Sequence, residues 1–218
     1  MRTRIKFCGM TRVEDVDAAV QLGADAIGLV FYPASARFVE PSRAAALVRR
    51  LPPFVSAVGL FVNPAAAWVR EVVRQVPLSM LQFHGDETPE TCAVLAAAGG
   101  ALPWLRALAV PAGSTPADLL ELADRYAAAR GVLLDTPSAA YGGSGRTFDW
   151  SCIPDDLGPR AVLAGGLNAR NVADAVRRVR PFAVDVSSGI EAAGAKGVKD
   201  AAEMAAFAAA VRTADATR

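Results

Sequence analysis

The sequence predicts a single (β/α)8 barrel spanning residues 1–218, with eight parallel strands inside an outer ring of helices. Three observations predict it. Eight short apolar runs recur at intervals of roughly 21 to 30 residues, the length of one βα unit. The runs are continuously apolar rather than alternating, which suits parallel strands covered by helices. Most intervening segments carry helix-start signals.

The apolar runs are IKFC from residue 5, AIGLVF from 26, AVGLFV from 57, MLQFHG from 80, WLRALAV from 104, GVLLDT from 131, AVLAGG from 161 and FAVDVS from 182. A doubly wound open sheet is the alternative fold, but it does not need eight such regular units. One barrel domain of about 200 to 250 residues fits the length of the chain.

Helix-start signals lie between the runs. Thr11 and Glu14 have capping-box spacing, with Val13, Val16 and Val20 on one helical face. Asn63-Pro64 places a capping residue before proline, ahead of a stripe of Val69, Val72 and Val76. Further openings occur at Thr115-Pro116, at Asn168 ahead of Val172, Ala175, Val176 and Val179, and at Asp200 and Glu203 ahead of Met204, Phe207 and Val211. Residues 137–160 form a glycine-rich loop with little helical periodicity.

The composition is that of a cytoplasmic globular protein. Hydrophobic residues make up 53% and charged residues 21%, and Lys+Arg 23 against Asp+Glu 22 leaves a net charge of +1. This balance provides no broad field for nucleic acid or an anionic membrane. An anionic substrate must therefore be bound by a few local donors.

The three cysteines, Cys8, Cys92 and Cys152, are far apart and have no CxxC spacing. A disulfide framework or a zinc site is therefore not expected, and a reducing compartment fits. Cys92 falls in a helical segment and Cys152 in a loop, so both are interpreted as structural. No metal or other cofactor is predicted, and neither a signal sequence nor a membrane span is recognisable.

In such barrels the reacting groups lie at the carboxyl ends of the strands. The residues at those ends include Cys8-Gly9, His84-Gly85, Asp135-Thr136, Gly165-Gly166 and Ser187-Ser188-Gly189. The loops after the seventh and eighth strands usually bind phosphate, and here they read AGGLN and SSGIE. Glycine lets backbone N–H groups approach an anion closely, although paired glycines also simply turn a chain.

Four side chains are candidates for chemistry. Cys8 is either a core thiol or a proton acceptor. Asp135 either caps a turn or acts as a general acid, with partial burial raising its pKa from about 3.9. His84, the only histidine, is either a rim residue or a substrate contact. Arg37 lies in a loop on the same face, where a guanidinium can bind a carboxylate bidentately.

Several motifs together resemble phosphoribosylanthranilate isomerases, in order from about residue 5 to residue 190. They are KFCGMT, GLVFYPASARFV, GLFVN, LQFHG, LLDT followed by YGGSGRTFDW, LAGGLN and RPFAVDVSSGIE. The phenylalanine of LQFHG, where the family often has leucine, and individual loop lengths around residues 99–117 are the departures.

The resemblance implies a cofactor-free Amadori rearrangement in tryptophan biosynthesis, from N-(5'-phosphoribosyl)anthranilate to 1-(2-carboxyphenylamino)-1-deoxyribulose 5-phosphate. It implies that Cys8 is the general base, Asp135 the general acid and Arg37 the contact for the anthranilate carboxylate. His84 is assigned to substrate binding. Phosphate binding falls on Gly165, Gly166, Ser188 and Gly189. A monomer or a homodimer is expected.

What makes Cys8 a thiolate at neutral pH stays open. Lys6 lies on the same strand face, where it either supplies positive charge or is neutralised by Asp185. Two other functions remain as alternatives. A two-substrate isomerase of histidine and tryptophan synthesis would be expected to use carboxylates as both acid and base. A non-catalytic phosphate-binding barrel would bind a ligand without turnover.

Overall fold

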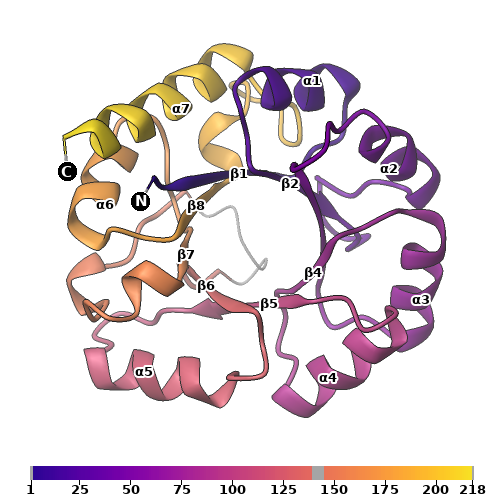
Figure 1. Cartoon of the computed structure of the whole chain (residues 1–218), viewed down its shortest axis with the longest axis horizontal. Coiled ribbons are helices and arrows are strands. Elements are labelled where there is room, and N and C mark those ends of the chain that lie inside the picture. The colour runs from indigo at the N-terminus through magenta and orange to yellow at the C-terminus, as the bar shows by residue number, and fades with distance from the viewer. Residues whose placement is uncertain (1, 139–144, 218) are drawn as a thin grey trace.

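The chain folds as a closed barrel of eight parallel strands, in which β8 pairs with β1. The computed structural model describes residues 2–138 and 145–217. Figure 1 shows the helices as a ring outside the strands. The predicted fold is therefore confirmed. The strands are β1 (Arg4–Cys8), β2 (Ala26–Val30), β3 (Ser56–Phe61), β4 (Met80–Phe83), β5 (Trp104–Ala109), β6 (Gly131–Asp135), β7 (Val162–Leu163) and β8 (Ala183–Val186).

Each strand lies within its apolar run or begins one residue before it, because both faces of the sheet are buried. Outward side chains such as Phe7, Leu81 and Val184 are fully buried against the helices. Inward side chains pack into a separate apolar cluster that fills the barrel below the strand ends. Its members are Leu105, Ala107, Leu133, Val162, Ala164 and Ala183. The interior is thus a packed core with one open end available for a site.

The helices are α1 (Val13–Gln21), α2 (Pro41–Val48), α3 (Ala66–Gln75), α4 (Pro89–Ala98), α5 (Pro116–Arg125), α6 (Val172–Val179) and α7 (Ala201–Ala216). Two predicted starts are confirmed. Thr115 accepts a hydrogen bond from the Asp118 backbone N–H at 3.3 Å, and the Asp118 carboxylate accepts one from the Thr115 N–H at 2.8 Å. Asp200 accepts from the N–H groups of Ala202 and Glu203 at 2.8 and 3.2 Å.

The predicted capping box of Thr11 and Glu14 is wrong. Helix α1 follows Arg12, with no side-chain cap, and the Thr11 hydroxyl donates to the carbonyl of Gly197 at 2.7 Å. The buried face contains Val16, whereas Val13 is exposed. The Thr11 hydroxyl therefore bonds to the distant Gly197 carbonyl instead of a backbone N–H in the first turn of α1.

The predicted cap at Asn63 is also wrong, since α3 begins at Ala66 after an Ala65 N-cap. Asn63 has a left-handed φ of 45°. Its backbone N–H donates to the Glu87 carboxylate at 2.7 Å, and its side-chain oxygen accepts from the Asp86 N–H at 2.7 Å. The predicted apolar stripe of Val69, Val72 and Val76 is nevertheless fully buried.

The remaining predicted start, at Asn168, is displaced, because α6 follows Asn171. The Asn168 side chain instead accepts from the backbone N–H of Arg170 at 2.9 Å. The predicted buried face of α6, formed by Val172, Ala175, Val176 and Val179, is confirmed.

Between β6 and β7 the described residues contain only two 3₁₀ turns, Trp150–Cys152 and Gly158–Arg160, where other units have an α-helix. This agrees with the lack of helical periodicity in residues 137–160. Residues 139–144 of that loop, including most of the YGGSG motif, lie outside the described residues.

A buried ion pair joins the neighbouring strands β1 and β8 inside the barrel. The ammonium of Lys6 on β1 donates to the carboxylate of Asp185 on β8 at 2.8 Å, with 5% and 8% of their side chains exposed. Burial opposes the charge of Lys6, but Asp185 raises the pKa of Lys6 above its usual value. Lys6 is therefore paired with Asp185, as one of the two sequence-based interpretations expects, and its charge also opposes the effect of burial on the pKa of Cys8, as the other expects.

Substituting Lys6→Met is expected to lower the free energy of unfolding by about 3–5 kcal/mol, because it leaves the Asp185 carboxylate buried without its cation. Urea denaturation monitored by circular dichroism measures the change. The double variant Lys6→Met/Asp185→Leu removes both charges and is expected to regain most of the loss. A Lys6→Met protein as stable as wild type would contradict this interpretation.

Candidate active site

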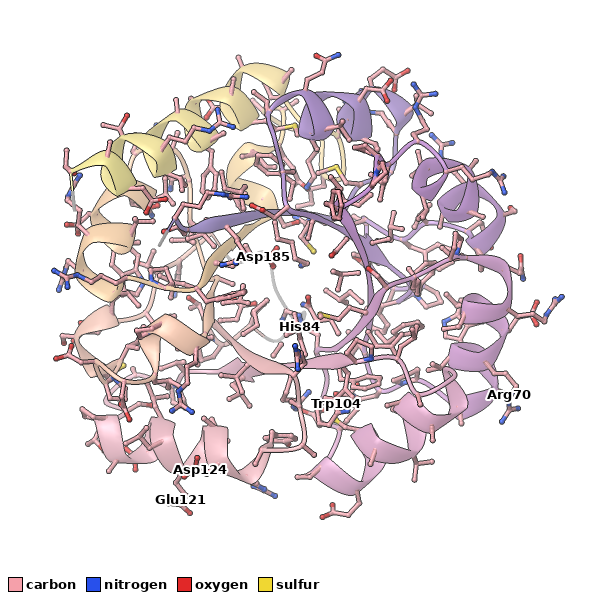
Figure 2. All side chains as sticks on the ribbon, viewed as in Figure 1. Arg70, His84, Trp104, Glu121, Asp124 and Asp185 are labelled. Atoms are coloured by element: carbon pink, nitrogen blue, oxygen red, sulfur yellow. The ribbon has the colours of Figure 1, made fainter. Side chains whose placement is uncertain are left out.

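The carboxyl ends of the strands surround one cavity. It contains most of the predicted site residues, namely Cys8, Arg37, His84, Asp135, Gly165, Gly166 and Ser188. Gly189 is absent from the lining, and a Cβ added there would lie 1.9 Å from the carbonyl oxygen of Leu167. The structure thus brings seven of the eight residues to one place. In Figure 2, His84 and Asp185 project toward the barrel interior, whereas Arg70, Glu121 and Asp124 lie on the outer helices.

Cys8 is the last residue of β1, and only 4% of it is exposed. It pairs in register with Gly28 on β2, where an added Cβ would lie 2.5 Å from the Cys8 sulfur. The missing side chain of Gly28 therefore makes room for the thiol. Burial raises the pKa of Cys8 above its usual value, and the positive charges of Lys6 and Lys199 oppose that increase.

Asp135 ends β6 and faces His84, the residue that follows β4. One carboxylate oxygen of Asp135 lies 3.0 Å from His84 Nε2, and the other accepts from the Thr136 N–H at 2.7 Å. Gln82 lies 2.9 Å from the opposite ring nitrogen of His84. The imidazole is thereby fixed between an amide and the carboxylate, so that His84 can orient Asp135 and exchange a proton with it.

A second buried ion pair positions the loop that carries His84. The Glu87 carboxylate accepts from the Gly85 N–H at 2.9 Å and from Arg106 at 2.7 Å, and 1% of its side chain is exposed. Arg106 also donates to the carbonyls of Phe83 and Gly85 at 3.0 and 2.8 Å. These bonds fix the backbone on both sides of His84.

Arg37 reaches the cavity from the loop after β2, but Glu191 also binds its guanidinium. Nε and one terminal nitrogen of Arg37 donate to the two oxygens of Glu191 at 2.7 and 2.9 Å. A guanidinium has a second donor edge, formed by its two terminal nitrogens. Glu191 therefore leaves Arg37 one edge for a second carboxylate. Burial opposes the charge of Glu191, yet Arg37 and Lys199 hold the pKa of Glu191 below its usual value.

The loop after β7 supplies backbone donors. Gly165 and Gly166 have left-handed φ angles of 80° and 62°, which favour glycine. Within the described part of the chain, no acceptor is found for the backbone N–H groups of these two residues. Two neighbouring N–H groups of this kind are suited to an anion such as phosphate.

Cys92 and Cys152 are also buried free thiols, and neither lines the cavity. Burial raises the pKa of Cys92 to about 11. Both therefore fit the structural role predicted for them. Among residues 2–138 and 145–217 no cluster of three or more metal-binding side chains occurs, and no helix there is long and apolar enough to cross a membrane.

Sequence reasoning did not select Glu87, Arg106, Glu191 or Lys199. Of these four, Arg106 has the clearest signal in the sequence, because it is a charged residue within the apolar run WLRALAV. Glu191 belongs to the SSGIE loop, but its pairing with Arg37 joins positions far apart in the sequence. Nothing local in the sequence marked Lys199.

A closed (β/α)8 barrel whose open end combines a thiol, a carboxylate beside an imidazole, a carboxylate-binding arginine and anion-binding glycines is typical of barrel enzymes that isomerise phosphorylated sugars. Comparison with known proteins specifies the class. The family model for N-(5'-phosphoribosyl)anthranilate isomerase matches residues 5–210. The chain therefore belongs to the N-(5'-phosphoribosyl)anthranilate isomerase family, whose members are aldose–ketose isomerases of tryptophan biosynthesis.

Individual relatives agree with this assignment. The enzyme of this name from Ralstonia nicotianae is 60% identical over 224 aligned residues, covering 99% of this chain and 95% of the relative. The crystal structure of phosphoribosyl anthranilate isomerase from Thermotoga maritima superposes with a TM-score of 0.84 at 41% identity, covering 97% of this chain and 99% of that one. Another phosphoribosyl anthranilate isomerase was solved with reduced 1-(o-carboxyphenylamino)-1-deoxyribulose 5-phosphate, and it has a TM-score of 0.78 at 36% identity, covering 97% and 99% of the two chains.

Proposed function

We propose that this chain converts N-(5'-phosphoribosyl)anthranilate to 1-(2-carboxyphenylamino)-1-deoxyribulose 5-phosphate, with Cys8 as general base and Asp135 as general acid. The observation that supports these roles is that β1 and β6 bring the thiol and the carboxyl group into one cavity. The reaction moves hydrogen within one molecule and needs no external oxidant or reductant, so we propose that it needs no cofactor.

In the first step, protonated Asp135 donates its proton to the ring oxygen of the ribose. The C1–O bond breaks, the nitrogen lone pair forms the C1=N bond, and a protonated Schiff base results. His84 lies 3.0 Å from the Asp135 carboxylate and orients the donor. In the orientation shown, the Gln82 amide N–H donates to Nδ1, so that Nε2–H donates to the Asp135 carboxylate once its proton has left.

In the second step, the Cys8 thiolate removes the proton from C2 of the sugar. The electrons of the C–H bond form a C1=C2 double bond, and the iminium nitrogen becomes neutral. The resulting enolamine tautomerises to the ketone by gaining a proton at C1 and losing the one on the C2 hydroxyl. Each proton-transfer group contributes on the order of 10² to 10⁴ in rate.

Binding groups at the two ends of the substrate position it between acid and base. Arg37 binds the anthranilate carboxylate through the donor edge that Glu191 leaves available. The backbone donors of Gly165 and Gly166, together with the loop of Ser188 and Gly189, bind the phosphate. With both ends fixed, the sugar carbons are confined to the space between Cys8 and Asp135.

Gly165→Ala is expected to lower kcat/KM by about 10²-fold, because a misplaced catalytic group costs rate on that scale. An added Cβ would lie 2.7 Å from the Thr136 nitrogen and 3.1 Å from an Asp135 carboxylate oxygen. Steady-state kinetics measures the effect. Gly100→Ala is the control, since Gly100 has a similar φ of 75° but no neighbour within 4 Å of an added Cβ. Equal losses in both variants would attribute the effect to backbone strain alone.

The whole proposal is tested by a fluorescence assay with freshly prepared N-(5'-phosphoribosyl)anthranilate and no added metal or nucleotide. Loss of substrate fluorescence supports the proposal, and binding without turnover would favour a non-catalytic barrel. Efficient turnover of the aminoaldose of histidine biosynthesis would favour a two-substrate isomerase. We also propose one domain and a monomer or homodimer, which sedimentation velocity can test. The phosphoribosylanthranilate isomerase of Thermotoga maritima is dimeric.

A further inference from the structure

Lys199 is a buried cation beside the cavity that the mechanism above does not use. It lies just before α7, and none of its side chain is exposed. Its ammonium donates to the carbonyl of Ser187 at 3.0 Å, to the hydroxyl of Ser187 at 3.3 Å and to Glu191 at 3.1 Å. An ammonium has three N–H donors, so all of them have partners. Lys199 is therefore bound in its charged form and has no donor left for a ligand.

The fold places this ammonium close to Cys8. Lys6 and Asp185 are partners in the β1–β8 register, and two residues further along each chain come Cys8 and Ser187. Both line the same cavity. The segment after Cys8 also anchors the lysine, since Thr11 donates to Gly197 at 2.7 Å and Arg12 donates to the Lys199 carbonyl at 3.0 Å.

The charges of the Lys6–Asp185 pair cancel, whereas those of Arg37, Glu191 and Lys199 do not. The ionisable groups that face the thiol from the surrounding elements are Lys6 on β1, Tyr32 and Arg37 after β2, His84 after β4, Asp135 on β6, Asp185 on β8, and Glu191 and Lys199 after β8. Lys6 and Asp185 form a neutral pair. Glu191 is shared by Arg37 and Lys199, and this group therefore retains one positive charge.

Ser187 lies between Lys199 and the cavity. Its hydroxyl oxygen accepts from Lys199, so its own hydrogen points elsewhere. No acceptor for that hydrogen occurs in the described ranges 2–138 and 145–217. An O–H group polarised by an ammonium is a strong donor to an anion.

We propose that Lys199 and Ser187 stabilise the thiolate of Cys8, Lys199 through its charge and Ser187 by donating its hydroxyl hydrogen. The proposal rests on the role of Cys8 as general base given above. Both residues act through Cys8 and are positioning residues. Burial raises the pKa of Cys8, and Lys199 is one of the two cations that oppose this increase. Burial also lowers the pKa of Lys199, while Glu191 opposes that change.

The test measures the thiolate of Cys8 without substrate. The rate of Cys8 alkylation by iodoacetamide is followed against pH, with the modified peptide quantified by mass spectrometry. Lys199→Gln keeps a hydrogen-bond donor but removes the charge. It is expected to react about tenfold more slowly at pH 7 and to regain the wild-type rate at high pH, as for a tenfold lower thiolate fraction. The pH profile of its kcat/KM is expected to move to higher pH by about one unit, which corresponds to the same tenfold change.

Matched variants separate charge from structure. Lys199→Arg retains the charge and is expected to react at nearly the wild-type rate. Lys196→Gln removes the same charge from an exposed position of the same loop, and its rate is expected to be unchanged. Ser187→Ala removes only a hydroxyl and is expected to slow alkylation at pH 7. It also serves as the test if Lys199→Gln does not fold.

An alkylation profile of Lys199→Gln that coincides with wild type would overturn the proposal, as would an unchanged Ser187→Ala profile if Lys199→Gln is unfolded. Failure of the underlying mechanism has a different signature. If Cys8→Ala retained wild-type turnover, Cys8 would not be the base, whatever its titration shows. If Cys8→Ala is inactive while Lys199→Gln alkylates normally, only the present inference fails.

Discussion

Cys8→Ala is expected to reduce kcat by about 10² to 10⁴, the range for one general base. The variant removes the proposed acceptor of the C2 proton but leaves Arg37 and the Gly165 loop in place. Binding of product is therefore expected to stay close to wild type. Stopped assays with high enzyme concentration measure turnover, and fluorescence titration measures product binding.

The control for this variant is Cys152→Ala, the same chemical change at a buried thiol outside the cavity. It is expected to keep its turnover. Because burial raises the pKa of Cys8, the thiolate fraction and with it kcat/KM are expected to rise with pH across the neutral range. Near wild-type kcat in Cys8→Ala would remove Cys8 from the mechanism.

Asp135→Asn is expected to lower kcat by a similar factor of about 10² to 10⁴. An amide has nearly the shape of the carboxyl group, and its oxygen can still accept from the Thr136 N–H. It has no acidic proton to give to the ring oxygen, so ring opening is expected to become rate-limiting. Single-turnover measurements with excess enzyme test this step directly.

Asp155→Asn provides the matched control, because Asp155 is exposed in the connection between β6 and β7. Its kinetics are expected to equal those of wild type. Full ring opening by Asp135→Asn would transfer the acid role to another group, with His84 the nearest candidate at 3.0 Å.

The strands were predictable because burial on both faces leaves a direct mark, a continuous apolar run. Because reacting groups in such barrels lie at the carboxyl ends of the strands, Cys8, Asp135 and His84 were selected as site residues. The structure places them in one cavity. Lys6 and Asp185 were paired correctly because the closure of a barrel makes its first and last strands neighbours.

Other features depended on contacts that no local pattern contains. Thr11 and Asn63 were mistaken for helix caps because their side chains bind Gly197 and the Asp86 N–H instead. Glu191 binds Arg37 across 154 positions of sequence. Such pairings depend on how the loops come together at the carboxyl ends of the strands. Helix and strand propensities describe neighbouring residues only and carry no information about contacts between distant loops.

The closure of the barrel also determines when, during synthesis, the contacts around Cys8 can form. Thr3 near one end of the chain donates to Asp215 near the other, across 212 residues, and β1 has no partner for its outer edge until β8 exists. During synthesis the segment carrying Cys8 leaves the ribosome well before the loop with Glu191 and Lys199. Until that loop has been synthesised, the thiol lacks the neighbours that define its environment, and the cavity is incomplete.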